Sequence, residues 1–297
     1  MLKDLLFIVN PRAGRTKSRA PLYDAISIFC NAGYRVFLQQ TQGPKDATRI
    51  ACELGPKFDL IVCSGGDGTL NETINGMMEI PLQKRPPLSY LPSGSTNDFA
   101  SGLSISSDPA TAAQSAMRLL PRHLDIGIFN DRHFVYVASF GAFTRTSYSV
   151  PQDIKNTFGH FAYLLEGVKD LDTLRPYHMR IETDDEVFDG QFLFGAVCNS
   201  TSVAGLMKIS PEKVSFDDGQ FELMLIPVPK TAAALQKLIH VLIAQDFDHS
   251  DGLIFRHISR VTAQTTEEIP WTLDGEYAPG ASKVDISIAR EGIQLMI

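Results

Sequence analysis

Hydrophobic positions in the first 125 residues alternate between short continuous runs and helical spacing. Each apolar run of strand length is followed by a segment in which apolar residues recur every three or four positions. The runs have no polar face, which indicates a mostly parallel sheet with helices on both faces. The pattern predicts strands at 5–9, 34–39, 60–64 and 88–91, and helices at 22–29, at 46–54, from 69 onwards and at 108–120.

From about residue 126 the apolar positions follow period-two alternation, with turns such as Asn130-Asp131 between them. This pattern is typical of an antiparallel β-sandwich. We therefore expect a doubly wound α/β domain in residues 1–125 and a β-sandwich domain in residues 126–297, with the last strand, about 290–297, as a candidate to return to the first domain. The expected strands of the second domain are 133–139, 178–183, 188–199, 220–227, 257–264 and 283–288.

Two helical stretches, 157–174 and 231–247, interrupt the second domain. The second stretch carries an apolar stripe at helical spacing, which can either touch a bilayer or pack in a core. Core packing is favoured because Lys237 is the only cation within the stretch. The stripe consists of Leu235, Leu238, Ile239, Leu242 and Ile243.

Charge and cysteine content narrow the classes of function. The 297 residues include 27 basic and 34 acidic side chains, and a net charge of −7 argues against a general nucleic-acid binder. The four cysteines form no CxxC pair and the seven histidines have no zinc spacing, which fits a reduced, cytoplasmic protein. No window approaches the ~20 apolar residues of a membrane span, so no transmembrane segment is expected and contact with lipid would be peripheral.

The third predicted strand ends in Gly65-Gly66-Asp67-Gly68, and Thr69 can open a helix. Glycines can adopt positive φ angles and let a bulky ligand approach the backbone N–H groups. A helix N-terminus favours phosphate, and Asp67 would repel phosphate unless a metal ion stood between them. The simplest interpretation is a magnesium–nucleotide site. The alternative is a glycine-rich turn in which Asp67 only caps the helix.

The ends of three other strands would lie at the same edge of a parallel sheet, where such sheets bind ligands. One is followed by residues 10–14 and then by three cations between residues 15 and 19, and one ends near Thr41. The fourth strand continues into residues 92–98, where Asp98 would supply a second carboxylate. A solvated basic loop and a simple cap of the next helix remain the alternatives for these segments.

Two acidic clusters occur in the second domain. Asp217-Asp218-Gly219-Gln220 precedes a strand and is either a hairpin turn, which we favour, or an oxygen-rich metal site. Leu273-Asp274-Gly275-Glu276 places two carboxylates around a glycine. This second cluster is either a polar turn or the position of a general base.

Together these motifs resemble those of the diacylglycerol kinase catalytic family, especially the soluble bacterial lipid kinases that are related to sphingosine and ceramide kinases. The GGDGT motif is shared with NAD kinases, whereas the block that ends in Asn97-Asp98-Phe99-Ala100 and the LDGE motif are more specific to lipid kinases. The motifs that carry the resemblance are Asn10–Gly14, Gly65–Glu72, Leu91–Ala100, Asp218-Gly219 and Leu273–Glu276.

The resemblance implies an ATP site, a magnesium site and a proton acceptor. Asp67 and Asp98 would hold the magnesium ion of the nucleotide, and Glu276, supported by Asp274, would accept the proton of a lipid hydroxyl. Ser95 stands where threonine is usual and keeps the hydroxyl. The residues implied in ATP binding are Asn10, Pro11, Arg12, Ala13, Gly14, Thr41, Gly65, Gly66, Asp67, Gly68, Thr69, Leu70, Asn71, Ser95 and Asp98.

The resemblance also implies a structural magnesium site, which is found in some bacterial members. Asp218 would bind the ion together with the carbonyl groups of Ser215 and Gln220. Glu222 stands where many relatives carry aspartate, which puts this site in doubt.

These features predict a kinase that uses ATP and Mg²⁺ to phosphorylate a lipid hydroxyl, most simply that of diacylglycerol, at the inner face of the membrane. An NAD kinase-like phosphotransferase and a catalytically silent nucleotide- or lipid-binding regulator remain the alternatives. The sequence does not decide which lipid is the acceptor, or whether the chain forms a homodimer.

Overall fold

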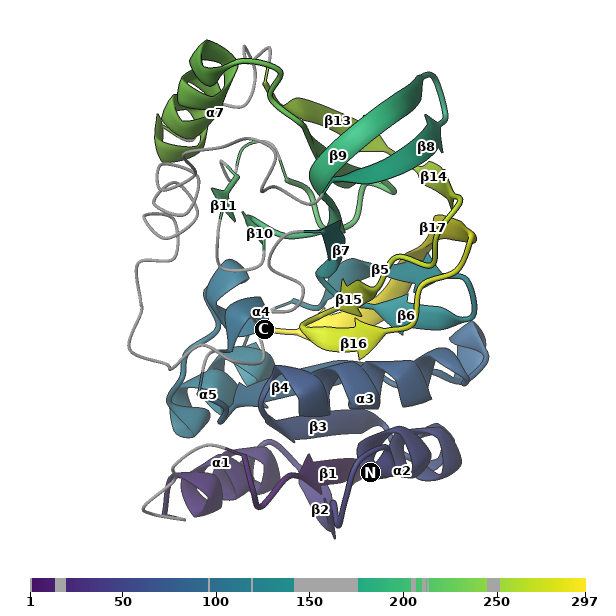
Figure 1. The fold of residues 1–297 in the computed structure, drawn as a ribbon. Helices are drawn as coiled ribbons and strands as arrows, with labels where there is room; N and C mark the ends of the chain where they lie inside the picture. Colours follow the sequence, from purple (N-terminus) through teal and green to yellow (C-terminus); the bar gives the residue numbers. More distant parts are fainter. Residues whose placement is uncertain are drawn as a thin grey trace. The chain divides into compact units, whose positions relative to one another are not determined.

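The computed structural model describes residues 2–13, 20–95, 97–118, 120–141, 176–203, 207–209, 212, 214–244 and 252–297. Contacts within the chain, which Figure 1 colours along its length, divide it into two compact units. Unit 1 comprises Met1–Ile126 and Ala289–Ile297, and unit 2 comprises Gly127–Ile288. The chain therefore leaves unit 1 and returns to it with its last residues.

Unit 1 contains the predicted parallel sheet. Its strands are β1 (Lys3–Val9), β2 (Tyr34–Gln40), β3 (Leu60–Gly65), β4 (Leu88–Pro92) and the end of β17 (Lys283–Met296). They run parallel in the order β17-β4-β3-β1-β2. The helices are α1 (Ala20–Asn31), α2 (Asp46–Leu54), α3 (Asp67–Met78), α4 (Asp98–Gly102) and α5 (Pro109–Arg118), with single 3₁₀ turns at Gly55–Lys57 and Leu82–Lys84.

Helices cover both faces of this sheet. Alternate residues of a strand point to opposite faces. Leu5 and Leu60 pack in one cluster with Phe29 of α1 and Ala113 of α5. On the other side α2 and α3 pack against each other and against β1 and β3. The doubly wound, mostly parallel fold class predicted for the first domain is thus confirmed.

Strand β2 differs from the prediction in its exposure. Among the described residues it pairs only with β1, so it forms the border of the sheet. Most of its residues are exposed, whereas those of β3 are all buried. The expectation that the strands have no solvent-exposed face is therefore wrong for β2, because an edge strand receives less cover than a central one.

Helices α2 and α3 approach so closely that Gly76 has no room for a side chain. A Cβ atom there would collide with the carbonyl oxygen of Thr48. We expect Gly76→Ala to lower the free energy of unfolding by about 1–2 kcal/mol, because overpacking costs more than the helix propensity that alanine gains. Urea unfolding measures this difference. Gly43→Ala is the control, since a Cβ atom there meets open space; an equal loss in both variants would contradict the packing argument.

Unit 2 is built mainly from antiparallel strands, as predicted. The first half of β17 also belongs to this unit. The strands form the order β16-β15-β7-β9-β8-β14-β17, and β12 pairs with β9 and with β13. The core contains many aromatic rings, including Trp271, whose centroid lies 4.8 Å from that of Phe140. The strands besides β17 are β5 (Arg122–Phe129), which crosses from unit 1 into unit 2, β6 (Arg132–Phe134), β7 (Val137–Gly141), β8 (Tyr177–Thr183), β9 (Val187–Cys198), β10 (Ser202–Val203), β11 (Met207–Lys208), β12 (Phe221–Pro227), β13 (Ile254–Ile258), β14 (Arg260–Thr265), β15 (Trp271–Leu273) and β16 (Glu276–Ala278).

Two strands predicted as continuous are interrupted. The stretch 133–139 breaks between β6 and β7, where the backbone N–H groups turn toward the carboxylate of Asp274. The stretch 257–264 breaks between β13 and β14, where the N–H groups of Ser259 and Arg260 donate to Asp184 at 2.8 and 3.1 Å. In both cases an aspartate far away in the sequence captures backbone donors that a continuous strand would use in its ladder.

The predicted helix 231–247 is found as α7 (Ala232–Ala244), and residues 245–251 lie outside the described part. Leu235, Leu238 and Leu242 are buried, which confirms core packing for these members of the apolar stripe. The predicted helix 157–174 lies outside the described residues. Within the described residues, no helix has both the length and the apolar composition that crossing a bilayer requires.

Strand β17 bends where it enters unit 1. Glu291 has a φ of 49°, and its N–H donates to the buried carboxylate of Asp125 at 2.6 Å. The guanidinium of Arg85 donates to the carbonyl groups of Met78, Ile80 and Gly292. Arg85 thereby ties the bend to the C-terminus of α3, and Leu295 and Met296 then pair with β4.

Candidate functional site

Three turns meet at the carboxyl edge of the parallel sheet in unit 1. The N–H of Asn10, after β1, donates to the carbonyl of Ser64 at 2.9 Å. The N–H of Ser93, after β4, donates to the carbonyl of Gly65 at 2.8 Å. The side-chain amide of Asn10 donates to the hydroxyl of Thr69 at 2.9 Å. Turns that are far apart in the sequence are therefore joined by direct hydrogen bonds at the edge where we predicted the site.

The glycines of these turns serve close packing rather than positive φ angles. Gly66 has a φ of −88°, and neither Gly65 nor Gly68 adopts a positive φ. A Cβ atom on Gly94 would lie 2.6 Å from the Cα atom of Gly66, and one on Gly65 would collide with Thr69. The expected positive φ angles are therefore wrong here. Glycine is needed because two backbones and a helix start share one small volume.

Asn97 and Tyr90 hold the turn after β4 in place, a role that the sequence analysis assigned to neither side chain. Asn97 has a φ of 52°, a conformation that asparagine tolerates better than most residues. Its side-chain oxygen accepts from the N–H of Gly94 at 2.9 Å, and its amide donates to the carbonyl of Gly94 at 3.0 Å. The Tyr90 hydroxyl donates to the carbonyl of Gly65 at 3.1 Å and so links the turn to β3.

Asp67 and Asp98 are brought together in the same turns. Helix α3 begins at Asp67, two residues before the predicted start, and the Asp67 carboxylate accepts from the N–H groups of Asp98 and Phe99 at 3.0 and 3.4 Å. Burial raises the pKa of Asp67. Burial, and then the charge of Asp67, raise the pKa of Asp98 to about 6. Both carboxylates are thus held where their negative charges are poorly compensated.

This pair fits a magnesium ion in its chemistry. Mg²⁺ prefers carboxylate oxygens and usually completes its shell with water and phosphate oxygens. A divalent cation beside Asp67 and Asp98 would offset the repulsion and the burial that raise the pKa of Asp98. Among the described residues no cluster of three histidine, cysteine or acidic side chains could hold a metal ion, so water, neutral protein oxygens or phosphate would supply the remaining ligands.

Magnesium binding to the free protein should therefore depend on pH. The pKa of Asp98 is raised in the folded state, so stability is lost as pH rises through about 6, and Mg²⁺ restores it only when Asp98 is ionised. We expect Mg²⁺ to raise the thermal unfolding midpoint more at pH 7.5 than at pH 5. Asp98→Asn should remove this difference, and equal shifts at both pH values in the wild type would contradict the assignment.

The other residues predicted for ATP binding in unit 1 differ in their surroundings. Thr41 is buried at the end of β2, and its N–H donates to the carbonyl of Val9. Leu70 has its side chain in the core, so only its backbone could face a ligand. Asn71 accepts from the side-chain amide of Asn75 at 2.9 Å. Residues 11–13 and Ser95 lie at the surface, and Gly14, the three cations after it and Thr96 lie outside the described residues.

Glu72, the last residue of the GGDGTLNE segment, has a structural contact that the motif did not suggest. Its carboxylate accepts from the N–H groups of Lys45 and Ala47 at 2.7 and 3.3 Å, at the start of α2. Lys45 has a φ of 65°, so the chain enters α2 through a sharp turn. A residue of α3 therefore satisfies free donors at the N-terminus of the neighbouring helix.

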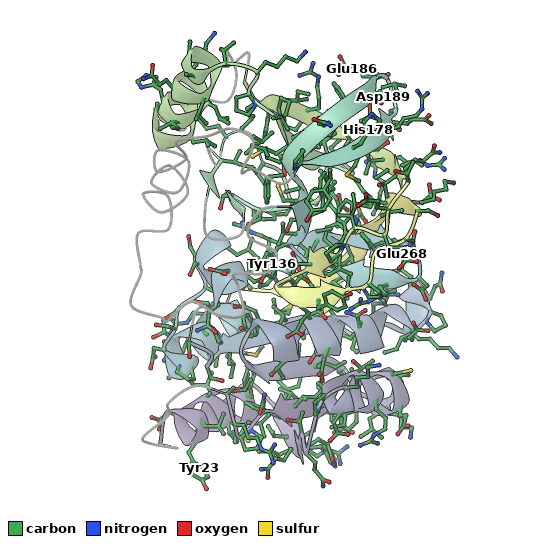
Figure 2. The ribbon with its side chains drawn as sticks, viewed as in Figure 1. Tyr23, Tyr136, His178, Glu186, Asp189 and Glu268 are labelled. Carbon is green, nitrogen blue, oxygen red and sulfur yellow. The ribbon has the colours of Figure 1, made fainter. Side chains whose placement is uncertain are left out.

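In unit 2, Asp274 and Gly275 form the two-residue turn between β15 and β16. Both have positive φ angles, 50° and 84°, as this tight hairpin turn requires. Asp274 is buried, and its carboxylate accepts from the N–H groups of Val135, Tyr136 and Val137 at 2.6, 2.9 and 3.0 Å. Asp274 thereby fixes the bend between β6 and β7 next to Tyr136, which Figure 2 labels.

Glu276 follows this turn and is exposed. Its backbone is held by the pairing of Leu273 with Glu276 across the hairpin. The two acidic residues of the LDGE motif therefore differ in kind: the oxygens of Asp274 are engaged by backbone donors, and the side chain of Glu276 is open to solvent. If Asp274 supports Glu276 as the base, as predicted, it would do so by fixing the shape of the hairpin that carries Glu276.

The second acidic cluster forms a turn before β12. Asp218 accepts from the N–H of Gln220 at 2.9 Å, Gly219 has a φ of 76°, and the Ser215 hydroxyl donates to Asp217 at 3.1 Å. Glu222 is buried, and burial, with the charge of Asp218, raises its pKa to about 8. The predicted turn is found, but among the described residues it closes no hairpin, because β12 pairs with β9 and β13 and not with the strand before it. The structural magnesium site at Ser215, Asp218 and Gln220 stays a prediction.

The fold and the turns define a two-domain protein, in which paired carboxylates lie at the carboxyl edge of an α/β domain and an antiparallel β domain follows. Residues 4–129 match the family model for the diacylglycerol kinase catalytic domain. Residues 137–296 match the model for the YegS C-terminal NAD kinase beta sandwich-like domain. The chain belongs to the diacylglycerol kinase family, and both the resemblance inferred from the motifs and the β-sandwich class of the second domain are confirmed.

Individual relatives agree with this assignment. The chain is 35% identical over 278 residues to a diacylglycerol kinase of Bacillus subtilis (strain 168), covering 93% of this chain and 90% of the relative. It is 32% identical over 281 residues to a diacylglycerol kinase of Staphylococcus saprophyticus, with the same coverage. A crystal structure of a diacylglycerol kinase from Bacillus anthracis str. Sterne has a TM-score of 0.76 at 21% identity, covering 99% of this chain and 96% of that one, and shares the fold.

Proposed function

We propose that this chain is an ATP- and Mg²⁺-dependent lipid kinase that transfers the γ-phosphate of ATP to a lipid hydroxyl, most simply that of diacylglycerol. The observation that carries the proposal is the Asp67–Asp98 pair, held by glycine-rich turns in a chain of the diacylglycerol kinase family. Relatives named diacylglycerol kinase make that lipid the first acceptor to test. The proposed place of action is the inner surface of a membrane.

In this proposal the turns of unit 1 bind and orient the nucleotide. The N–H groups at the start of α3 would receive phosphate oxygens, because a helix N-terminus carries unpaired donors and partial positive charge. Asp67 and Asp98 would hold Mg²⁺. Asn10 and Asn97 hold the turns in place through their side-chain hydrogen bonds. When bound, ATP would supply the phosphoryl group, and Mg²⁺ would offset the negative charge of the phosphate oxygens during transfer.

Glu276 is the proposed proton acceptor for the lipid hydroxyl. A lipid alcohol is barely acidic, so a carboxylate beside it assists as the new O–P bond forms. Asp274 would act as a positioning residue, because its carboxylate oxygens already accept three backbone N–H groups. No covalent phospho-enzyme is required.

Two other functions share part of this machinery. An NAD kinase would also use the GGDG turn, but the Asn97–Ala100 block and the named relatives favour a lipid acceptor. A silent regulator would keep the fold without needing the acidic residues, and Asp67, Asp98 and Glu276 are all present. No observation favours either alternative over the lipid kinase.

The test is transfer of labelled phosphate from ATP, with Mg²⁺, to a panel of lipids in mixed micelles and in vesicles, and separately to NAD. Phosphorylated diacylglycerol that depends on Mg²⁺ is the expected result. Phosphorylation of NAD alone would overturn the lipid assignment. Magnesium-dependent ATP binding without transfer to any acceptor would favour the regulator.

A further inference from the structure

The position of Glu276 is set by its backbone, because its side chain is exposed. The two residues before it, Asp274 and Gly275, form the turn between β15 and β16. A Cβ atom at Gly275 would meet no atom within 4 Å, so packing against neighbours does not hold the glycine. Next to Glu276 the turn therefore depends on its hydrogen bonds rather than on packing.

The carboxylate and the N–H of Asp274 fix only the first part of the turn. The carboxylate accepts from the N–H groups of residues 135–137, and the N–H donates to the carbonyl of Val137 at 2.8 Å. These bonds hold Asp274 as far as its Cα atom. The peptide that joins Asp274 to Gly275 lies beyond that atom, and a rotation of this peptide would change the direction in which the chain reaches Glu276.

The side chain of Tyr136 holds this peptide. Its hydroxyl donates to the main-chain carbonyl of Asp274 at 3.2 Å. Tyr136 is 7% exposed, its N–H donates to the carboxylate of Asp274 at 2.9 Å, and its carbonyl accepts from the N–H of Asn199 at 3.1 Å. A buried ring with backbone bonds on both sides keeps the hydroxyl in one place. Tyr136, labelled in Figure 2, is thus a fixed donor for the turn.

The conformation of the turn makes such a restraint useful. Asp274 has a φ of 50° and Gly275 a φ of 84°. A left-handed aspartate costs free energy and persists where the surrounding contacts impose it. Glycine adopts positive and negative φ angles about equally readily, so Gly275 does not select one orientation of the peptide by itself. The hydrogen bond from Tyr136 selects it instead.

We propose that Tyr136 is a positioning residue for phosphoryl transfer. Its hydroxyl fixes the peptide between Asp274 and Gly275 and thereby holds Glu276 where it takes the proton of the lipid hydroxyl. This inference rests on the proposed function, in which Glu276 is the proton acceptor. The effect of Tyr136 passes through the hairpin, and the residue that reacts is Glu276.

Tyr136→Phe removes the hydroxyl and keeps the ring. We expect kcat for lipid phosphorylation to fall about tenfold with an unchanged KM for ATP, because a misplaced base slows the chemical step and the nucleotide turns of unit 1 are untouched. Thr272→Val is the matched control, since it removes a buried hydroxyl of the same hairpin that lies 3.0 Å from the hydroxyl of Ser139. It should keep the wild-type kcat. Equal losses in the two variants would overturn the inference.

A double-mutant cycle separates positioning from general damage. In the Glu276→Gln background, Tyr136→Phe should lower kcat no further, because the group that it positions is already gone. If the two losses multiplied, Tyr136 would act independently of Glu276 and the inference would be wrong. Full activity of Glu276→Gln would refute the assignment of the base and the inference with it.

The turn can also be observed without any activity, by NMR of protein with isotope-labelled glycine. We expect one sharp Gly275 signal in the wild type and in Thr272→Val, and a broadened or doubled signal in Tyr136→Phe, as the peptide exchanges between orientations. Gly275→Ala identifies the signal by its loss. A single sharp signal in Tyr136→Phe would overturn the inference. If the wild type transferred no phosphate, the proposed function would fail, whereas the NMR result would still decide whether Tyr136 holds the turn.

Discussion

Asp67→Asn is expected to lower the rate of lipid phosphorylation by about 10²–10³-fold while the protein stays folded. Phosphoryl transfer depends on positioning and on charge neutralisation, and the substitution removes one of the two charges proposed to hold Mg²⁺. The asparagine oxygen can still accept from Asp98 or Phe99, as the carboxylate does now. Because burial raises the pKa of Asp67, a neutral amide is the less costly group to bury, so the unfolding midpoint should not fall.

Asp59→Asn is the matched control for this experiment. Asp59 is an exposed acid of the same unit, and its carboxylate accepts from the N–H of Asp4 at 2.7 Å. Its substitution should leave the phosphorylation rate unchanged. Wild-type activity in Asp67→Asn would refute the proposed magnesium site, and equal losses in the two variants would point to general damage rather than to the site.

Asp274→Ala is expected to lower the free energy of unfolding by roughly 3–5 kcal/mol, because it leaves several buried N–H groups without an acceptor. The three donors are those of Val135, Tyr136 and Val137. Trp271, the only tryptophan of the chain, is buried in the core of unit 2 and precedes Asp274 on the same hairpin. Urea unfolding followed by tryptophan fluorescence therefore reports on this unit.

Glu276→Gln is the companion variant that separates catalysis from stability. The Glu276 side chain is exposed, so the change should leave the unfolding curve in place while phosphorylation falls. If Asp274→Ala instead lost activity with unchanged stability, Asp274 would be part of the proton transfer. If Glu276→Gln kept full activity, another group would have to be the proton acceptor.

Local patterns predicted most elements of both domains correctly. The apolar run at 60–64 and the residues that follow it became β3 and α3, and the stretch 46–54 became α2. The predictions failed where a distant side chain intervenes. Asp184 and Asp274 each interrupt a stretch that alternates like a strand, and nothing near Ser259 or Val135 in the sequence marks the break. The exposure of β2 was missed for a related reason, since strand order is not encoded locally.

In the candidate site, too, local patterns predicted correctly and the predictions failed where contacts between distant residues decide. Asp67 and Asp98 were predicted to share one edge because both follow parallel strands, and they do lie together. The role of the glycines was misjudged, because the contact of Gly66 with Gly94 depends on how two loops pack. The backbone-holding role of Asn97 was also missed, although asparagine is one of the few residues that tolerate a left-handed conformation. The chemical assignments of these residues stay predictions until activity is measured.

The return of β17 to β4 has a consequence for biosynthesis. The ribosome makes a protein from its N-terminus, and domains generally fold as units while the chain emerges. Unit 1 is begun first, but its parallel sheet lacks the neighbour of β4 until Leu295 and Met296 have been made. Unit 2 has all of its residues before then. Of the two units, the one begun first is therefore the last to be completed, and a chain that stops before Leu295 would leave β4 with an open side.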